Sequence, residues 1–272
     1  MEQIQDFQGE QNKNRFAVLH EENNRRSNHE SKNAMMTLIT GHMGFIGNEL
    51  GKQLSHIGLD LKEKNNILLC DLPPAKTIIH LAAQSRVLPS IEDPVYDAET
   101  NIVGTIRLAK QYRKARFIFA SSEGAIQKKI TSPYGLSKSC AEEYIKLLHD
   151  DYVILRFPNV YGRPWSGSVI DKFINGPVVI NGDGTATRDY VHVDDVVRAI
   201  KMAVDWPTGT YHLGSEIYYG VLELAKATGQ PYTFGPTIEG EQQHTETKNT
   251  TPNWQPEIDV IDYIVRHKIK SG

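Results

Sequence analysis

Cysteine is scarce in this chain of 272 residues, which contains only Cys70 and Cys140. So few cysteines exclude a scaffold of disulfides, and a reduced, cytoplasmic compartment is the simplest interpretation. No group of Cys and His residues has the spacing of metal ligands, so we expect no metal.

Long apolar runs and an excess of charge of one sign are also missing. No run approaches the roughly 20 residues that span a bilayer, and the N-terminus has no apolar core of a signal peptide. The net charge is −3, so the chain lacks the basic excess that binding to nucleic-acid phosphates requires. With 39% hydrophobic residues, the sequence predicts one large globular domain or two small ones, with no membrane or nucleic-acid partner.

Residues 1–34 differ in composition from the rest of the chain. Asn and Gln supply ten of these positions and charged residues supply eleven, with one apolar cluster at residues 16–19. Such a segment buries too little apolar surface to offset its ordering entropy, so we interpret it as a disordered tail. It is either an extension from an upstream start site or a short arm that binds a partner.

A glycine-rich turn follows the first apolar strand, which we expect at residues 37–40. The turn contains three glycines and leads into a helix. Gly41 permits the tight turn, Gly44 permits the approach of a pyrophosphate, and Gly47 permits close packing of the helix on the strand. Asp60 lies 19 residues after Gly41, at the end of a second short apolar segment, where its carboxylate can accept the ribose hydroxyls of NAD. Lys62 lies nearby, so NADP is the alternative cofactor.

Further motifs follow in a fixed order. These are the apolar segment 78–81 with Ala82, Ala83 and Gln84, the N-x-x-G-T run from Asn101, the strand 117–122 that ends in Ser121-Ser122, the Y-x-x-x-K pair Tyr134 and Lys138, the segment 155–162, and the G-D-G and R-D segment 182–195. In this order they resemble the extended short-chain dehydrogenase/reductase family, specifically its NAD-dependent nucleotide-sugar epimerases and dehydratases. The resemblance covers nearly all of residues 36–260.

This resemblance implies an α/β fold. A doubly wound, parallel Rossmann sheet of strand order 3-2-1-4-5 would bind NAD with residues 36–158, and residues 159–272 would mostly form a small α/β lobe for the substrate. The lobe would hold a nucleotide-diphosphate sugar.

The catalytic residues implied by the resemblance are Ser122, Tyr134 and Lys138. Tyr134 and Lys138 lie one helical turn apart on the same face. A tyrosine hydroxyl ordinarily has a pKa near 10, and we expect Lys138 and the nicotinamide charge to lower it, so that Tyr134 can remove a proton from a sugar hydroxyl. Ser122 would hydrogen-bond the same hydroxyl.

The resemblance also assigns binding residues. For the cofactor they are Gly41, Gly44, Phe45, Ile46, Gly47, Asp60, Asp71, Leu72, Leu81, Ala82, Ala83, Asn101, Tyr134 and Lys138. For the substrate they are Gln84, Ser122, Glu123, Asn159 and Arg188, of which Asn159 and Arg188 match positions that hold the diphosphate. An ion pair of Arg188 with Asp189 is the other interpretation of this arginine, and His80, His192 and His212 are expected to pack or to lie at the surface.

The chain departs from its relatives at two places. Only 9 residues separate Asp71 from His80, so we expect an extended crossing without a helix between Asp71 and Thr77, and a third strand of two or three residues. The V-Y-G turn that usually follows the catalytic serine is missing, and Glu123 occupies one of the two positions at which dehydratases carry an acid. Glu123 either faces the sugar or is an exposed loop carboxylate.

The sequence thus predicts an NAD-dependent 4-epimerase that acts through a transient 4-keto sugar. The alternatives are a 4,6-dehydratase or a related reductase or decarboxylase, a simple alcohol or ketone reductase, and an NAD-bound regulatory protein without turnover. We also expect a homodimer through residues 94–113 and 134–149.

Overall fold

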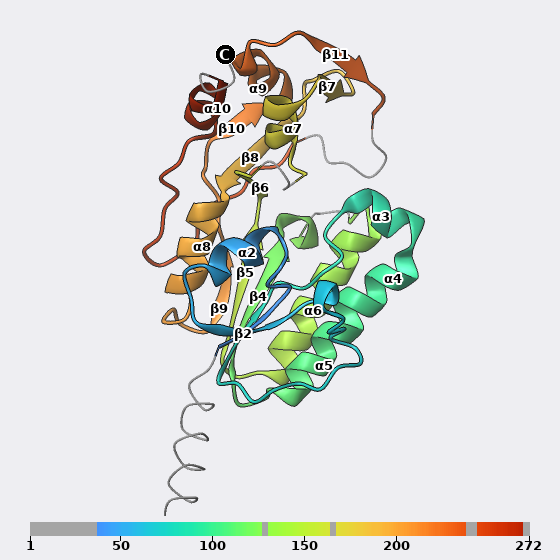
Figure 1. Cartoon of the computed structure of the whole chain (residues 1–272), viewed down its shortest axis with the longest axis vertical. Helices are drawn as coiled ribbons and strands as arrows, with labels where there is room; N and C mark the ends of the chain where they lie inside the picture. Colours follow the sequence, from blue (N-terminus) through green and yellow to red (C-terminus); the bar gives the residue numbers. More distant parts are fainter. Residues whose placement is uncertain (1–36, 127–129, 164–166, 238–243, 269–272) are drawn as a thin grey trace, which may run out of the picture.

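The computed structural model describes residues 37–126, 130–163, 167–237 and 244–268; the predicted tail, residues 1–34, lies outside the described residues. Its largest element is a parallel sheet of six strands (Figure 1). In spatial order the strands are β2 (His56–Leu59), β1 (Thr37–Thr40), β3 (Thr77–His80), β4 (Arg116–Ser122), β5 (Tyr152–Phe157) and β9 (Gly209–His212). The inner strands are rich in apolar residues that are buried on both faces, which is typical of a parallel sheet.

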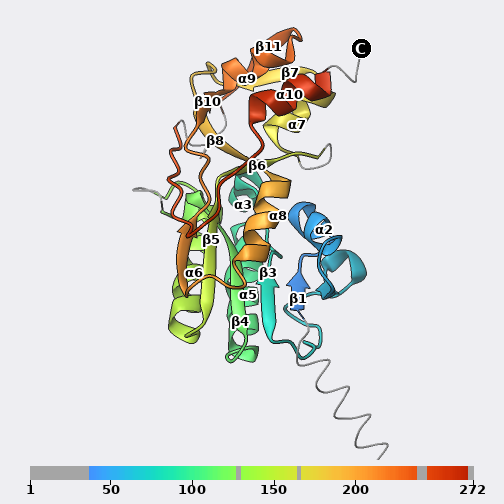
Figure 2. The same cartoon turned by 90° about the vertical axis from the view of Figure 1, so that its left-hand side faces the viewer.

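Helices cover both faces of this sheet (Figure 2). One face packs on α2 (Phe45–Gly51) and α8 (Val193–Met202), around a cluster that includes Ile39, Ile79 and Val197. The other face packs on α5 (Gly104–Gln111) and α6 (Pro133–Leu148), around Leu38, Phe117 and Ile145. Two short helices, α3 (Val87–Glu92) and α4 (Pro94–Ala98), lead into α5 through a π-helical turn, η2 (Glu99–Val103). The fold is therefore the α/β Rossmann-like fold that the sequence predicts.

A smaller lobe lies over the carboxyl end of the sheet, at the top of Figure 1. Its strands are β6 (Asn159–Tyr161), β8 (Thr187–His192) and β10 (Tyr218–Gly220) in one sheet, and β7 (Val178–Asn181) and β11 (Tyr232–Gly235) in another. Its helices are α7 (Val169–Asn175), α9 (Val221–Thr228) and α10 (Val260–Lys268). Residues beyond 159 do not all belong to this lobe, because α8 and β9 return to the large sheet.

The segment between Asp60 and Thr77 corrects one expectation. A short third strand was predicted, but these residues form none, and β2 is the edge of the sheet. A short 3₁₀ turn, η1 (Leu61–Glu63), is followed by turns and an irregular stretch, and Ile67 packs into the cluster beneath α5. The predicted absence of a helix between Asp71 and Thr77 is confirmed.

Side chains of α5 and of Tyr112, which follows it directly, fix this segment in place of strand pairing. The Arg107 guanidinium donates hydrogen bonds to the carbonyls of Ile67 and Cys70, the second at 2.7 Å. The Tyr112 hydroxyl donates to the carbonyl of Pro73 at 2.6 Å. Because the segment is too short to form a further strand, its backbone carbonyls accept hydrogen bonds from these side chains instead of from a neighbouring strand.

Of the described helices, none is long and apolar enough to cross a membrane.

We predict that Arg107→Gln lowers the free energy of unfolding by about 2 kcal/mol, because two carbonyls lose a charged donor. Urea denaturation measures this change. The control is Lys110→Gln, which removes the same charge from an exposed position of the same helix. Equal stability of the two variants would show that Arg107 does not hold the segment.

Candidate active site

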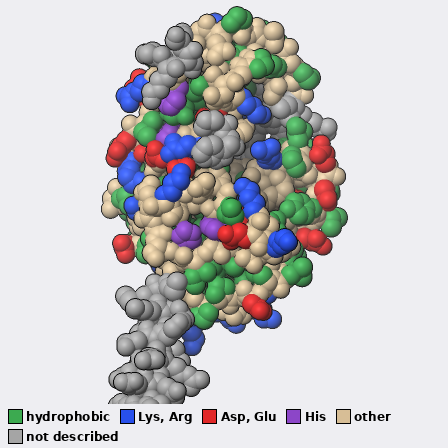
Figure 3. Space-filling model, viewed as in Figure 1, with side chains coloured by type: hydrophobic (Ala, Val, Ile, Leu, Met, Phe, Trp, Pro, Cys, Tyr) green, Lys and Arg blue, Asp and Glu red, His purple; other side chains and the backbone are tan. Residues whose placement is uncertain are grey.

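A cavity of about 880 Å³ lies at the carboxyl ends of β1, β3, β4 and β5, between the large sheet and the lobe. This is where open α/β sheets bind ligands. On the face shown in Figure 3, acidic and basic side chains are interspersed rather than gathered by sign. The residues that line the cavity come from the glycine turn, the ends of β3 and β4, the start of α6 and the lobe.

The glycine turn is packed too tightly for side chains. Gly41 has a φ of +72°, and a Cβ there would lie 2.7 Å from the backbone nitrogen of Ala82. A Cβ on Gly47 would lie 2.1 Å from the carbonyl oxygen of Gly41. These glycines line the cavity together with Gly44, Phe45 and Ile46. The turn therefore offers a cradle into which a phosphate group can approach.

Asp60 ties the glycine turn to the end of β2. It is buried, and its two carboxylate oxygens accept hydrogen bonds from the backbone nitrogens of Met43 at 3.0 Å and Lys62 at 2.9 Å. The Lys62 ammonium donates to the carbonyl of Met43 at 3.0 Å. Because carboxylate oxygens have further lone pairs, Asp60 can still accept hydroxyl groups in the cavity that it lines.

The structure separates two residues that the sequence assigns to the cofactor. Asp71 is exposed and Leu72 packs on the cluster beneath α5, and neither lines the cavity. The residues that line this end instead are Asn65, Asn66, Ile67 and Leu68. The missing third strand explains the difference, because the expected position of Asp71 depended on that strand.

Ser122 and Tyr134 meet in the cavity. Ser122 ends β4, and Tyr134 lies in the first turn of α6. This helix begins at Pro133, and the Ser132 hydroxyl oxygen caps it by accepting a hydrogen bond from the Gly135 nitrogen at 3.2 Å. Burial raises the pKa of Tyr134, and the Ser122 side chain opposes this shift. The predicted lowering depends on the charge of the bound nicotinamide as well as on Lys138, so it stays a prediction.

Lys138 lies one turn after Tyr134 and is buried. Its ammonium donates to the carbonyl of Ala120 at 2.9 Å and lies 4.7 Å from the ring centre of Phe119. Burial lowers the pKa of Lys138 to about 8, against the opposite effect of the carboxylates of Asp97 and Glu142. The ammonium of Lys138 therefore loses its proton at a lower pH than that of an exposed lysine.

The side-chain amide of Asn101 joins three elements behind the cavity. Its oxygen accepts from the Gln84 nitrogen at 2.9 Å, and its nitrogen donates to the Gln84 carbonyl at 2.9 Å, to Ser137 Oγ at 3.0 Å and to Asp97 Oδ1 at 3.1 Å. The side chain of Gln84, predicted to touch substrate, bonds instead to Asp97 and to the backbone of Arg86. Gln84 does not line the cavity, whereas Leu81, Ala82 and Ala83 do.

Glu123 has a partner that the sequence did not reveal. Its carboxylate lies 2.8 Å from His212 Nδ1, and the other ring nitrogen of His212 lies 3.1 Å from Arg156. Arg156 also holds Glu142 in a buried ion pair. Glu123 lines the cavity, but 89 residues separate it from His212, so no local pattern could have predicted the pair.

Asn159 and Arg188 face the cavity from the lobe. Asn159 donates to the carbonyl of Asp189 at 3.1 Å, and Arg188 donates to the carbonyl of Thr187 at 3.0 Å. The carboxylate of Asp189 accepts from the nitrogen and the hydroxyl of Ser215. Thr245 and Thr247 line the same end and were missed, because nothing in their local sequence distinguishes them.

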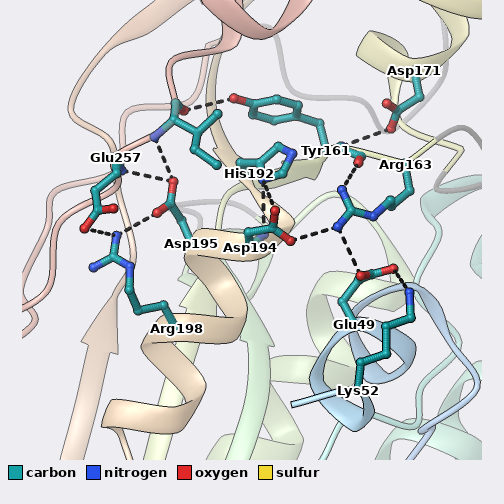
Figure 4. A network of polar contacts seen from close by, with 12 residues as sticks. Glu49, Lys52, Tyr161, Arg163, Asp171, His192, Asp194, Asp195, Arg198 and Glu257 are labelled. Atoms are coloured by element: carbon teal, nitrogen blue, oxygen red, sulfur yellow. Dashed lines mark hydrogen bonds and ion pairs between the residues drawn. The ribbon is translucent and has the colours of Figure 1, made fainter.

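An ion cluster joins the glycine turn to the lobe (Figure 4). Glu49 on α2 is 4% exposed and pairs with Lys52 at 2.8 Å and with Arg163, just after β6, at 3.0 Å. Arg163 also pairs with Asp194 at the start of α8, at 2.9 Å. Helix α2 is thereby tied to the end of β6 and to the start of α8.

In the described ranges, no group of three or more His, Cys, Asp or Glu side chains is arranged to hold a metal ion.

Known proteins match this chain over most of its length. Residues 55–214 match the model of the NAD dependent epimerase/dehydratase family. A UDP-glucose 4-epimerase of Mycolicibacterium smegmatis is 30% identical over 85% of this chain and 97% of its own length. A dTDP-D-glucose 4,6-dehydratase of Dictyostelium discoideum is 27% identical over 70% of this chain and 60% of its own length.

Two solved structures share the fold. The UDP-glucose 4-epimerase of Thermotoga maritima, solved with UDP-glucose, has a TM-score of 0.76 and 27% identity, over 87% of this chain and 99% of its own. The UDP-glucose 4-epimerase of Thermus thermophilus, solved in complex with NAD, has a TM-score of 0.72 and 25% identity, over 88% of this chain and 100% of its own.

We predict that Gly47→Ala lowers the free energy of unfolding by about 2 kcal/mol, because its methyl group would displace the carbonyl of Gly41. Thermal unfolding of the purified variant measures the loss. Gly176→Ala is the matched control, since the nearest atom to a Cβ there is 3.5 Å away, an ordinary contact. A Gly47→Ala variant as stable as this control would mean that the turn is not closely packed.

Proposed function

The chain belongs to the NAD-dependent epimerase/dehydratase family, and we propose that it is a nucleotide-sugar 4-epimerase that keeps its NAD bound through turnover. The observation that carries this proposal is that Ser122, Tyr134 and Lys138 line one cavity, with Lys138 one turn after Tyr134 along α6. These three groups meet at the carboxyl end of the sheet and are faced by Arg188 and Asn159 from the lobe.

The residues present fit a dinucleotide. The cradle of Gly41, Gly44 and Gly47 suits the pyrophosphate, Asp60 suits the adenosine ribose, and residues 65–68 suit the adenine end. Leu81, Ala82 and Ala83 continue this wall toward the catalytic residues. When bound, NAD supplies a hydride acceptor that can return the hydride to the sugar.

Tyr134 is the general base in this proposal. Its oxygen takes the proton of the sugar 4-hydroxyl as the hydride leaves the same carbon, and Ser122 hydrogen-bonds that hydroxyl. Because burial raises the pKa of Tyr134, its phenolate needs positive charge nearby, which the Lys138 ammonium and the oxidised nicotinamide supply. Lys138 would also hold the nicotinamide ribose. The resulting 4-keto sugar would turn, so that the hydride can return to its other face while Tyr134 gives the proton back to the 4-oxygen.

The lobe would hold the rest of the substrate. Arg188 is 6% exposed and lies where its guanidinium can donate parallel, charge-assisted hydrogen bonds to a diphosphate. Asn159 lies beside it in the cavity wall. The related epimerases act on UDP-glucose by name, so a UDP-sugar is the first substrate to test.

Dehydration is the second candidate, because Glu123 follows Ser122 directly. An acid that assists elimination must be free to exchange a proton with the sugar. Glu123 is instead paired with His212 at 2.8 Å, which favours epimerisation over dehydration. A reductase or decarboxylase, or an NAD-binding regulatory protein without turnover, would use the same cavity and remains an outcome of the assay.

We predict that the purified protein contains NAD and interconverts UDP-glucose and UDP-galactose. Tyr134→Phe should lower kcat at least about 100-fold, because a general base contributes this much or more, while the bound NAD is retained. Nucleotide analysis of the denatured protein and product analysis by mass and NMR measure both. A product that has lost one water would indicate a dehydratase, and wild-type protein with NAD but no turnover of any nucleotide sugar would contradict the proposal.

We also propose a homodimer through α4, α5 and α6. Apolar side chains are exposed on α4, on α6 and on the turn η2 that leads into α5, among them Val95, Val103 and Leu147, the last of which is 78% exposed. An apolar face of this kind fits a second copy of the same surface.

Leu147→Glu is expected to convert the dimer to a monomer, since a carboxylate would be buried in the apolar contact. Analytical ultracentrifugation measures the mass. The control is Ile217→Glu, at an exposed apolar position of the lobe. A monomeric wild type, or the same dimer in both variants, would contradict this interface.

A further inference from the structure

Asp97 is a buried carboxylate for which the proposed reaction has no use. It lies on α4, outside the lining of the cavity, and is 1% exposed. Its Oδ1 accepts from the side-chain nitrogens of Gln84 at 3.0 Å and Asn101 at 3.1 Å. Its Oδ2 is buried without a hydrogen-bond partner among the described residues. Burying a charged oxygen in this way is costly unless a nearby positive charge compensates it.

Lys138 is the positive charge available. Helix α4 packs against α6, which carries Lys138 and Tyr134 (Figure 1). Asp97 acts electrostatically on both: its charge raises the pKa of Lys138 and that of Tyr134. The same carboxylate thus favours the ammonium form of Lys138 and disfavours the phenolate form of Tyr134.

The other groups around Lys138 cannot replace this charge. Glu142 lies one turn further along α6, but Arg156 binds both of its oxygens and Ser121 donates to one of them. His80 on β3 is fully buried beside Thr40 and Thr105, and burial, with the nearby Lys138 charge, lowers its pKa to about 3, so it is neutral. Among the described residues, Asp97 is therefore the carboxylate near Lys138 that has no ion pair with an arginine or another lysine.

We propose that Asp97 is a positioning residue, the buried counter-charge of Lys138, and that it sets the pH range in which Tyr134 and Lys138 work together. This inference rests on the proposed function, since it assigns the role of an additional residue at the same site. Asp97 does not touch the substrate. It acts through Tyr134 and Lys138, and through Asn101, which bonds both Asp97 and Ser137 on α6.

The main test is the pH dependence of the single-turnover reduction of bound NAD by the nucleotide sugar. The rate requires the phenolate of Tyr134 and the ammonium of Lys138, so the two limbs of the profile report these two groups. Asp97→Asn keeps the size and the acceptor oxygen but removes the charge. Because the charge raises both pKa values, both limbs should move to lower pH, by about one unit.

Asp93→Asn is the matched control. Asp93 caps the same helix through the Tyr96 nitrogen at 2.9 Å, is exposed, and loses the same charge, while asparagine is an equally good cap. Its pH profile should coincide with that of the wild type. A purely structural role of Asp97 would lower the rate without moving either limb, and that result would overturn the proposal.

A second measurement does not depend on activity. Lys138→Met leaves Asp97 uncompensated, so this variant should unfold at a lower urea concentration than the wild type. The deficit should shrink as the pH falls from 8 to 5, because an uncompensated buried carboxylate binds a proton more readily in the folded state than in the unfolded one.

The double variant Asp97→Asn/Lys138→Met should regain stability at pH 8 relative to Lys138→Met alone. Additive losses, or a deficit of Lys138→Met that does not change with pH, would refute the counter-charge. If the wild type binds NAD but turns over no sugar while this coupling is present, the proposed function fails and the charge pair stands.

Discussion

The side-chain amide of Asn101 is the contact on which the rest of the site depends. It bonds to both backbone groups of Gln84, as a neighbouring strand would, and so fixes the chain where it leaves β3 and passes along the cavity. It also bonds to Ser137 in the turn of α6 that separates Tyr134 from Lys138. Asn101 lies within the π-helical turn η2, where the wider turn brings this amide inward. One buried amide thereby sets the distance between the wall of the cavity and the helix that carries the base.

The site combines a need for burial with a need for charge. Burial raises the pKa of Tyr134 and lowers that of Lys138, so each group moves away from the form that the chemistry requires. Water-filled surroundings would remove this conflict, but they would also weaken every electrostatic interaction with the substrate. The carboxylates of Asp97 and Glu142 favour the charged form of Lys138, and the Ser122 side chain opposes the rise in the pKa of Tyr134.

The sequence predicts those parts of the molecule that local chemistry determines. The positions of Gly41 and Gly47 follow from the turn that they make, and the pairing of Tyr134 with Lys138 follows from the helical repeat. The fold class, the family and the absence of a helix after Asp71 could likewise be predicted. The third strand was wrong because Asp71 looked like a strand end, whereas the carbonyls of this segment bond to Arg107 and Tyr112, which lie more than 30 residues away. The partners of Glu123 and Glu49 escaped prediction for the same reason, since they are separated by 89 and 114 residues.

The return of α8 and β9 to the large sheet has a consequence for how the molecule can move and assemble. The chain passes to the lobe at β6, comes back for α8 and β9, leaves again for β10, and returns once more so that Trp254 packs on α8 before α10 ends in the lobe. No single linker connects the two parts, so no single bond cleavage would release either as an intact folding unit. Opening of the cleft would therefore require several backbone segments to bend together, so the two parts are coupled in motion as well as in folding.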